Sequence, residues 1–66
     1  MRADDREQID VIKETYAAKV LELAVSTMRN HRHLGKGPPY LKLGRAVRYR
    51  MSDLIEYIEK NRIEPE

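Results

Sequence analysis

The sequence predicts a small, mainly α-helical domain with one β-hairpin, in the order helix, helix, hairpin, helix. Three stretches place apolar residues three and four positions apart, a spacing typical of amphipathic helices. Another stretch alternates apolar and basic residues around a Gly-Arg pair, which is typical of two strands joined by a tight turn. Because the chain has 66 residues and no cysteine, it has room for one domain, whose fold must rest on packing without a disulfide or a thiolate zinc site.

The first helix is predicted from apolar residues that recur at helical spacing in the first third of the chain. Its start is open, because three upstream aspartates would suit the positive end of a helix dipole, whereas Thr15 could cap a shorter helix. We expect residues 15–22 to form its core. Residues 1–14 form an N-terminal segment that either stays separate or extends this helix, since residues 10–14 have a helical pattern.

The second helix is predicted to begin near Val25 and to end at Gly35. Ser26 and Thr27 suit its opening turn. Only residues 22–24 separate the two helical patterns, which favours two helices that cross through a tight turn over two that lie antiparallel.

A hairpin is predicted over residues 40–51. Gly37-Pro38-Pro39 comes before it and changes the chain direction, since neither proline can donate a backbone hydrogen bond and each restricts its neighbour to extended backbone. Gly44-Arg45 then forms a two-residue turn with glycine at its first central position. Strict alternation along the strands predicts one core face and one cationic face. The core face would hold Leu41, Leu43, Val47, Tyr49 and Met51, and the cationic face Lys42, Arg48 and Arg50.

The last helix is predicted over residues 53–62, with Ser52 as its cap. Acidic residues fall in its first turn and basic residues in its last, as the helix dipole favours. We expect the folded domain to span residues 15–63 and residues 64–66 to be a frayed C-terminal tail.

The charge of the chain is unevenly distributed. No acidic residue occurs between Glu22 and Asp53, a stretch with seven basic residues and both histidines. The flanks hold all 11 acidic residues and six basic ones, so a net charge of +7 in the middle contrasts with −5 outside it. Such a basic field attracts a polyanion, most often a nucleic acid, although a solvated surface that only keeps a small protein soluble would show the same pattern.

Five segments of the chain carry a family resemblance. They are residues 17–21 (AAKVL), 25–29 (VSTMR), 35–45 (GKGPPYLKLGR), 47–50 (VRYR) and 52–54 (SDL). They resemble, in order, the first-helix motif, the opening of the recognition helix, the loop and the wing, and the start of the final helix of the small winged helix-turn-helix proteins of the MerR-like, excisionase and AlpA group. The wing segment is the most specific part. The resemblance implies a winged helix-turn-helix that binds double-stranded DNA.

Two departures from that family pattern concern the turn between the first two helices and the segment upstream of them. The family commonly has a glycine and then a serine in the turn, where this chain has Glu22 and Ala24. The usual cap is then missing, so the turn could be tighter and the recognition helix could start late. Upstream, the family has an extended segment that ends in a threonine or serine, whereas residues 10–14 have a helical pattern.

The residues expected to contact DNA lie on the second helix, the loop after it and the hairpin. A recognition helix reaches base edges from its N-terminal residues, whereas later residues and loops hold phosphates. Base contacts are assigned to Ser26, Thr27, Arg29 and Asn30, because arginine can bind guanine and asparagine adenine through two hydrogen bonds. The first two could instead only cap the helix. Phosphate contacts are assigned to Arg32, His33 and Lys36. Wing contacts are assigned to Lys42, Arg45, Arg48 and Arg50, with the arginine at the tip in a minor groove.

Neither an enzyme nor a metal or cofactor site is predicted. The chain has no glycine-rich phosphate loop, no paired carboxylates in the basic region and no nucleophile with an obvious base. His31 and His33 would point to different sides of a helix, without a third ligand at metal spacing. No apolar run is long enough to span a membrane, and the first residues lack an apolar signal region. We expect a cytoplasmic protein with no membrane or small-molecule partner.

The resemblance implies an excisionase, a recombination directionality factor of a phage or other mobile element. Such a protein binds and bends attachment-site DNA, associates with further copies of itself there and promotes excision by a tyrosine integrase. An AlpA-like transcriptional regulator would use the same surface at a promoter, and the sequence does not separate the two. A third hypothesis, of another class, is a protein-interaction module in which the last helix and the acidic flanks dock a partner. Since the chain has no heptad pattern, we expect a monomer in solution.

Overall fold

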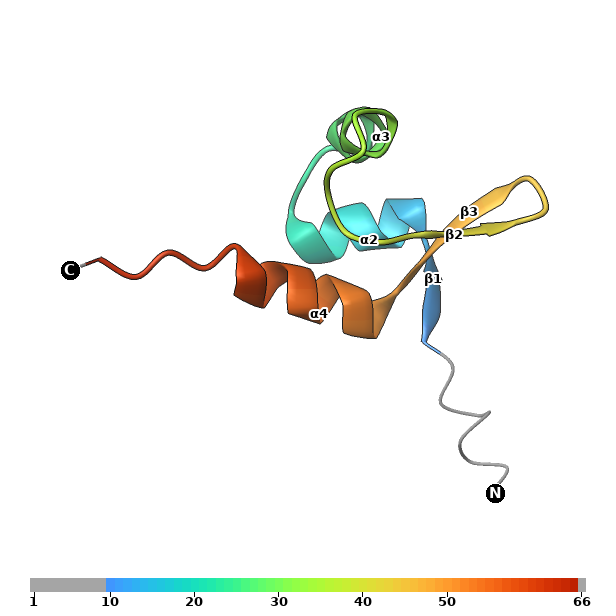
Figure 1. Cartoon of the computed structure of the whole chain (residues 1–66). Coiled ribbons are helices and arrows are strands. Elements are labelled where there is room, and N and C mark those ends of the chain that lie inside the picture. Colours follow the sequence, from blue (N-terminus) through green and yellow to red (C-terminus); the bar gives the residue numbers. More distant parts are fainter. Residues whose placement is uncertain (1–9, 66) are drawn as a thin grey trace, which may run out of the picture.

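The computed structural model describes residues 10–65, and it confirms the order helix, helix, hairpin, helix (Figure 1). The elements are β1 (Val11–Lys13), α2 (Glu14–Leu21), α3 (Val25–His33), β2 (Leu41–Leu43), β3 (Ala46–Arg50) and α4 (Met51–Lys60). The strands form one antiparallel sheet in the order β1-β3-β2, with the hairpin strand β3 in the centre.

Helix α2 lies at the centre of the molecule and contacts α3, α4, β1 and β3. In Figure 1, α2 runs across the view between α3 and α4, while α3 is seen nearly end-on. Helices α2 and α3 therefore cross, as expected. The core is small. Its buried residues are Ala17 and Ala18 of α2, Met28 of α3, Tyr49 of β3 and Leu54 of α4. Because each of these elements contributes to one cluster, the core holds α3 and the hairpin in a fixed relation.

Of the two alternatives for the N-terminal segment, a helical extension through residues 10–14 is wrong, because Val11–Lys13 form a strand. Ile12 pairs with Tyr49 and Lys13 with Arg48, which makes β1 the partner of the free edge of β3. Its β-branched residues Val11 and Ile12 suit a strand. Helix α2 therefore begins only at Glu14, after the extended backbone of Lys13. The other expectations for the N-terminal segment fall on residues 1–9, outside the described residues.

The turn between α2 and α3 contains a residue with a positive φ, a conformation that glycine usually adopts. Glu22 adopts a left-handed conformation with a φ of 56°. The Leu23 amide donates to the Ala18 carbonyl at 2.9 Å, which closes the end of α2. Helix α3 then starts at Val25, as predicted from its pattern and not late. The expected absence of a cap is confirmed, because Ala24 precedes the helix without a side-chain hydrogen bond.

The hairpin turn is as predicted, but the two faces of the hairpin are not. Gly44 has a φ of 66° in a two-residue turn between Leu43 and Ala46, which pair across the strands. Directly paired residues share a face, so this register places Leu41 beside Arg48 and Lys42 beside Val47. The prediction of one apolar and one cationic face is therefore wrong. Tyr49, Val47, Ile12 and Lys42 share one face, and Leu41, Leu43, Arg48, Arg50 and Lys13 share the other.

Helix α4 starts two residues earlier than predicted, and Ser52 is not its cap. The Ser52 amide instead donates to Oδ2 of Asp10 at 2.8 Å, and the Met51 amide donates to the Asp10 carbonyl at 2.9 Å. The cap thus comes from a residue at the far end of the sequence that β1 brings to the start of α4. The hydrogen bond from the Ser52 amide, aided by the Arg50 charge, holds the pKa of the Asp10 carboxyl below its usual value. Helix α4 ends at Lys60, and residue 66 of the predicted tail is outside the described residues.

No helix within residues 10–65 combines the length and the apolar character that crossing a membrane would require.

Candidate nucleic-acid interface

Helix α3 presents a polar side to solvent. Ser26, Asn30 and His33 are exposed and recur every three to four residues, so they lie on one side of the helix, opposite the buried Met28. Thr27 is half-buried on one flank of this side. Arg29 lies on the flank toward α2, with 62% of its side chain exposed. Of the residues predicted to contact bases, all but Thr27 are thus exposed.

A carboxylate at the start of α2 joins three elements. Glu14 accepts two hydrogen bonds from Arg32, from Nε to Oε2 and from Nη2 to Oε1, each 3.1 Å long. The Tyr49 hydroxyl donates a third, also of 3.1 Å. The Glu14 side chain is only 11% exposed. Burial alone would raise the pKa of this carboxyl, but the hydrogen bonds from Arg32 and Tyr49 outweigh burial and hold it below its usual value.

Arg32, predicted to contact phosphate, is occupied within the fold. Its side chain is 18% exposed, with both its Nε and one Nη bound to Glu14. Its guanidinium carbon also lies 5.7 Å from the centre of the Tyr40 ring, in reach of a cation–π contact. The hydrogen bonds to Glu14 raise the already high pKa of Arg32, so its charge is permanent. A phosphate contact would require Arg32 to exchange these partners.

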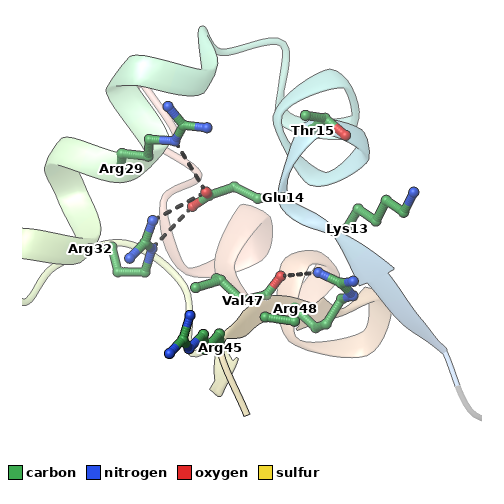
Figure 2. A pocket seen from close by; sticks show the side chains of 9 residues that line it. Lys13, Glu14, Thr15, Arg29, Arg32, Arg45, Val47 and Arg48 are labelled. Atoms are coloured by element: carbon green, nitrogen blue, oxygen red, sulfur yellow. Dashed lines mark hydrogen bonds and ion pairs between the residues drawn. The ribbon is translucent and has the colours of Figure 1, made fainter. Parts of the chain in front are cut away.

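A cationic hollow lies between α3, the start of α2 and the hairpin (Figure 2). It has a volume of about 390 Å³, and five of the nine residues that line it are basic. These are Lys13, Arg29, Arg32, Arg45 and Arg48. The Glu14 carboxylate points toward α3, between Arg29 and Arg32, and it is the one carboxylate among the lining residues. Since Glu14 offsets a single positive charge of five, the hollow favours an anion.

The hollow brings together some of the predicted contact residues and leaves others apart. Arg29 of the predicted base set lines the hollow together with Arg45 and Arg48 of the predicted wing set. Lys42 lies on the opposite face of the sheet from Arg48. Arg50 lies at the far end of β3, 3.6 Å from Oδ1 of Asp10 and next to the start of α4.

The remaining two predicted phosphate contacts lie beyond the hollow. His33 is exposed at the end of α3, and Lys36 is exposed in the loop that follows. The Lys36 amide donates to the His31 carbonyl at 2.9 Å, which fixes this loop against the end of the helix.

Two charged residues of the hollow were missed by reasoning from the sequence. Lys13 and Glu14 fall in the segment interpreted as helical and outside the acid-free stretch. The only local signal was the pair of β-branched residues before them, which is typical of a strand. Pairing of Lys13 with Arg48 then brings a further cation to the hairpin.

Metal binding has no support in the part of the chain that the structure describes. Within residues 10–65, no three side chains of the metal-ligating kinds gather at one place.

A family model described as a helix-turn-helix domain matches residues 15–62 of the chain. The match covers nearly all of α2 together with α3, the hairpin and α4, and it leaves out β1, Lys13 and Glu14. This family comprises AlpA/excisionase-like small DNA-binding proteins. A comparison with curated proteins gives no match.

Proposed function

Because the chain belongs to the helix-turn-helix domain family of small DNA-binding proteins, we propose that it binds double-stranded DNA in a sequence-specific manner through α3 and the hairpin. The observation that carries this proposal is the cationic hollow, which brings Arg29 on the flank of α3 together with Arg45 and Arg48 of the hairpin. A DNA strand carries a regular row of negative phosphates, and basic residues supply most of the affinity for it. Proteins of such families are generally not enzymes.

In this proposal, α3 reads the major groove with its exposed side. Ser26 and Asn30 face the base edges, and Arg29 reaches a guanine from the flank, since an arginine can donate two hydrogen bonds to that base. Thr27, which is half-buried, contributes at the edge of this surface. Because Met28 of α3 packs in the core, only the exposed side of this helix is available for contacts with bases.

The phosphate contacts then come from the rim of the hollow and from the loop after α3. Lys13 and Arg48 lie side by side on neighbouring strands, and Lys36 and His33 lie at the end of α3. Arg45, at the tip of the hairpin, is proposed to enter the minor groove next to the one that holds α3. Lys42 lies on the opposite face of the sheet from Arg48, and Arg50 lies at the far end of β3 beside Asp10. We propose that these two residues contribute only to the long-range field.

The finer function that we propose is that of an excisionase. The protein would bind repeated sites beside an attachment sequence, bend the DNA and help a tyrosine integrase to excise a phage or mobile element. Cooperative contacts between neighbouring copies on DNA, and a place on the bacterial nucleoid in the cytoplasm, belong to the same proposal. It is supported by membership in a family that includes excisionase-like proteins.

Two experiments test sequence-specific DNA binding and the excisionase role separately. Selection from a pool of random duplexes should enrich one sequence, and Arg48→Ala should weaken binding to this sequence and to random duplex alike. Lys60→Ala, which removes an exposed cation from the distant α4, is the matched control and should change neither. Failure to enrich any sequence would contradict specific binding.

Excision is then reconstituted with the neighbouring integrase and a plasmid that carries the attachment site. Stimulation by the wild-type protein is expected. Binding without stimulation would contradict the excisionase role and favour an AlpA-like regulator, whereas an absence of any DNA binding would favour a protein-interaction module.

A further inference from the structure

Glu14 is an unexpected residue at the centre of a surface that is proposed to bind a polyanion. It lines the hollow, where every other charged lining residue is basic. The two hydrogen bonds from Arg32 and the one from Tyr49 account for its part in holding α2, α3 and β3 together. They do not account for its third neighbour, Arg29, whose Nε lies 3.5 Å from Oε1 of Glu14.

We propose that Glu14 is a specificity-determining positioning residue that acts through Arg29. This inference rests on the proposed function, since it concerns how the same surface tells one DNA sequence from another. Glu14 faces the Nε edge of the Arg29 guanidinium. No residue between 10 and 65 accepts a hydrogen bond from the terminal Nη groups, which belong to a side chain that is 62% exposed and can donate to a base.

The first consequence is orientation. An arginine side chain has many rotamers, and fixing one of them before binding reduces the entropy lost when two hydrogen bonds to guanine form. Glu14 can fix Arg29 because it is itself held rigidly, with only 11% of its side chain exposed and three donors around it.

The second consequence is discrimination. A free arginine on this surface would bind any phosphate, whatever the sequence. The negative charge of Glu14 disfavours a phosphate in the hollow and competes for Arg29, so it lowers the affinity for random DNA more than for a site at which Arg29 finds a guanine. Specificity is a difference between two affinities, and a repulsive group can increase it.

The test compares wild-type protein with Glu14→Gln on two probes, the duplex selected by the wild-type protein and a short duplex of random sequence. The glutamine keeps the shape of the side chain and an acceptor for Tyr49 but loses the charge. We expect the affinity for random duplex to rise about fivefold, the factor that one unit charge at close range is worth in water. Its dependence on salt should steepen by about 0.9 in log–log slope, as for one more phosphate contact. The affinity for the selected duplex should change less, so the ratio of the two affinities falls.

Glu56→Gln is the matched control. It makes the same change in net charge at an exposed site on α4, where the carboxylate is 66% exposed and lies 3.9 Å from Lys60. It should leave the ratio of affinities at the wild-type value. If Glu56→Gln lowers the ratio as much as Glu14→Gln does, the effect is one of net charge and the inference is wrong.

A second pair of variants tests whether Glu14 acts through Arg29 and remains informative if Glu14→Gln fails to fold. Arg29→Lys keeps the charge and leaves the bonds of Glu14 to Arg32 intact. It should weaken binding to the selected duplex while leaving random duplex nearly unchanged. In an Arg29→Ala background, Glu14→Gln should no longer alter the ratio.

Three results separate the inference from the function beneath it. If wild-type protein binds neither duplex, the proposed function itself is contradicted. If wild-type protein discriminates and Glu14→Gln changes both affinities by the same factor, only the role of Glu14 is contradicted. If Arg29→Lys weakens both duplexes alike, the proposed orientation of Arg29 is wrong.

Discussion

The two ends of β1 carry one carboxylate each, and they differ in what they hold. Asp10 precedes the strand and accepts a hydrogen bond from the Ser52 amide at the start of α4. Glu14 follows the strand and accepts hydrogen bonds from Arg32 and Tyr49. Both connect β1 to a helix that is distant in sequence, and both have a pKa below its usual value.

The difference lies in their surroundings. Asp10 is on the α4 side of the molecule and is the more exposed of the two, whereas Glu14 lies inside the cationic hollow. The Asp10 carboxylate therefore only stabilises the fold. The Glu14 carboxylate also stabilises the fold, and we propose that it increases the sequence specificity of the DNA-binding surface as well. Changes at Asp10 should act on stability alone, and changes around Glu14 on stability and binding together.

The largest expected effect on stability comes from Arg32→Ala. Removing the guanidinium leaves the nearly buried Glu14 carboxylate with one donor, and we expect the free energy of unfolding to fall by about 2–3 kcal/mol. Arg50→Ala is the corresponding change at the Asp10 end, where the arginine is 53% exposed and 3.6 Å from the carboxylate. It should lower the free energy of unfolding much less, because solvent screens an exposed ion pair. Urea unfolding measures both, and equal losses would contradict the contrast between the two ends.

The next effect is a loss of stability in acid. The pKa of both carboxyls is lower in the folded protein than in the unfolded chain, so the unfolded chain takes up protons first as the pH falls. Stability should be fully present above the usual pKa values of 3.8 and 4.5 and decline as the pH falls through them toward the folded values. Thermal unfolding at a series of pH values should show this decline. Asp10→Asn and Glu14→Gln should each make the decline shallower, and an unchanged pH profile in both would contradict the assignment.

A smaller effect is expected from Asp10→Ala. The variant leaves the Ser52 amide without its acceptor at the start of α4, so the melting temperature should fall, by less than in Arg32→Ala. Among the folded molecules, the affinities for selected and random duplex should both equal those of wild type. The fluorescence anisotropy of each labelled duplex, titrated with protein well below the melting temperature, checks these affinities. A change in the ratio of the two affinities would show that the Asp10 end also contributes to recognition.

The smallest expected effect is a gain in stability. Helix α4 has its cap from Asp10, whereas α3 begins after Ala24 without a side-chain cap. Ala24→Ser supplies an acceptor for the first amides of α3 and should raise the free energy of unfolding by about 0.5–1 kcal/mol. Ala24→Val adds a side chain without an acceptor and should give no gain. If the two variants are equally stable, the start of α3 already has its hydrogen bonds satisfied.

Local patterns in the sequence were enough to predict α2, α3, α4 and the tight turn at Gly44. Each depends on apolar spacing or on turn residues within about ten positions, which local sequence records well. The faces of the hairpin were also encoded. Leu43 and Ala46 flank a two-residue turn and so must pair, and alternation from that pair puts Leu41 beside Arg48. The wrong prediction came from counting along the two strands without this register.

Other features depend on contacts that no local pattern records. The strand β1 has three residues and forms because β3 offers it a free edge. The cap of α4 comes from Asp10, 42 positions away from Ser52. The acid-free stretch predicted the basic surface, but it records only which residues are neighbours in the sequence. In space, β1 and the start of α2 bring Lys13 and Glu14 into that surface.

The salt dependence of duplex binding is the most direct test of the central claim, that α3 and the hairpin form one DNA-binding surface. About three charged phosphate contacts, from Lys13, Lys36 and Arg48, predict a log–log slope near −3 on random duplex. Lys13→Ala and Arg48→Ala, from different elements of the hollow, should each make the slope shallower by about 0.9. A flat salt response, or a slope that both variants leave unchanged, would contradict the account.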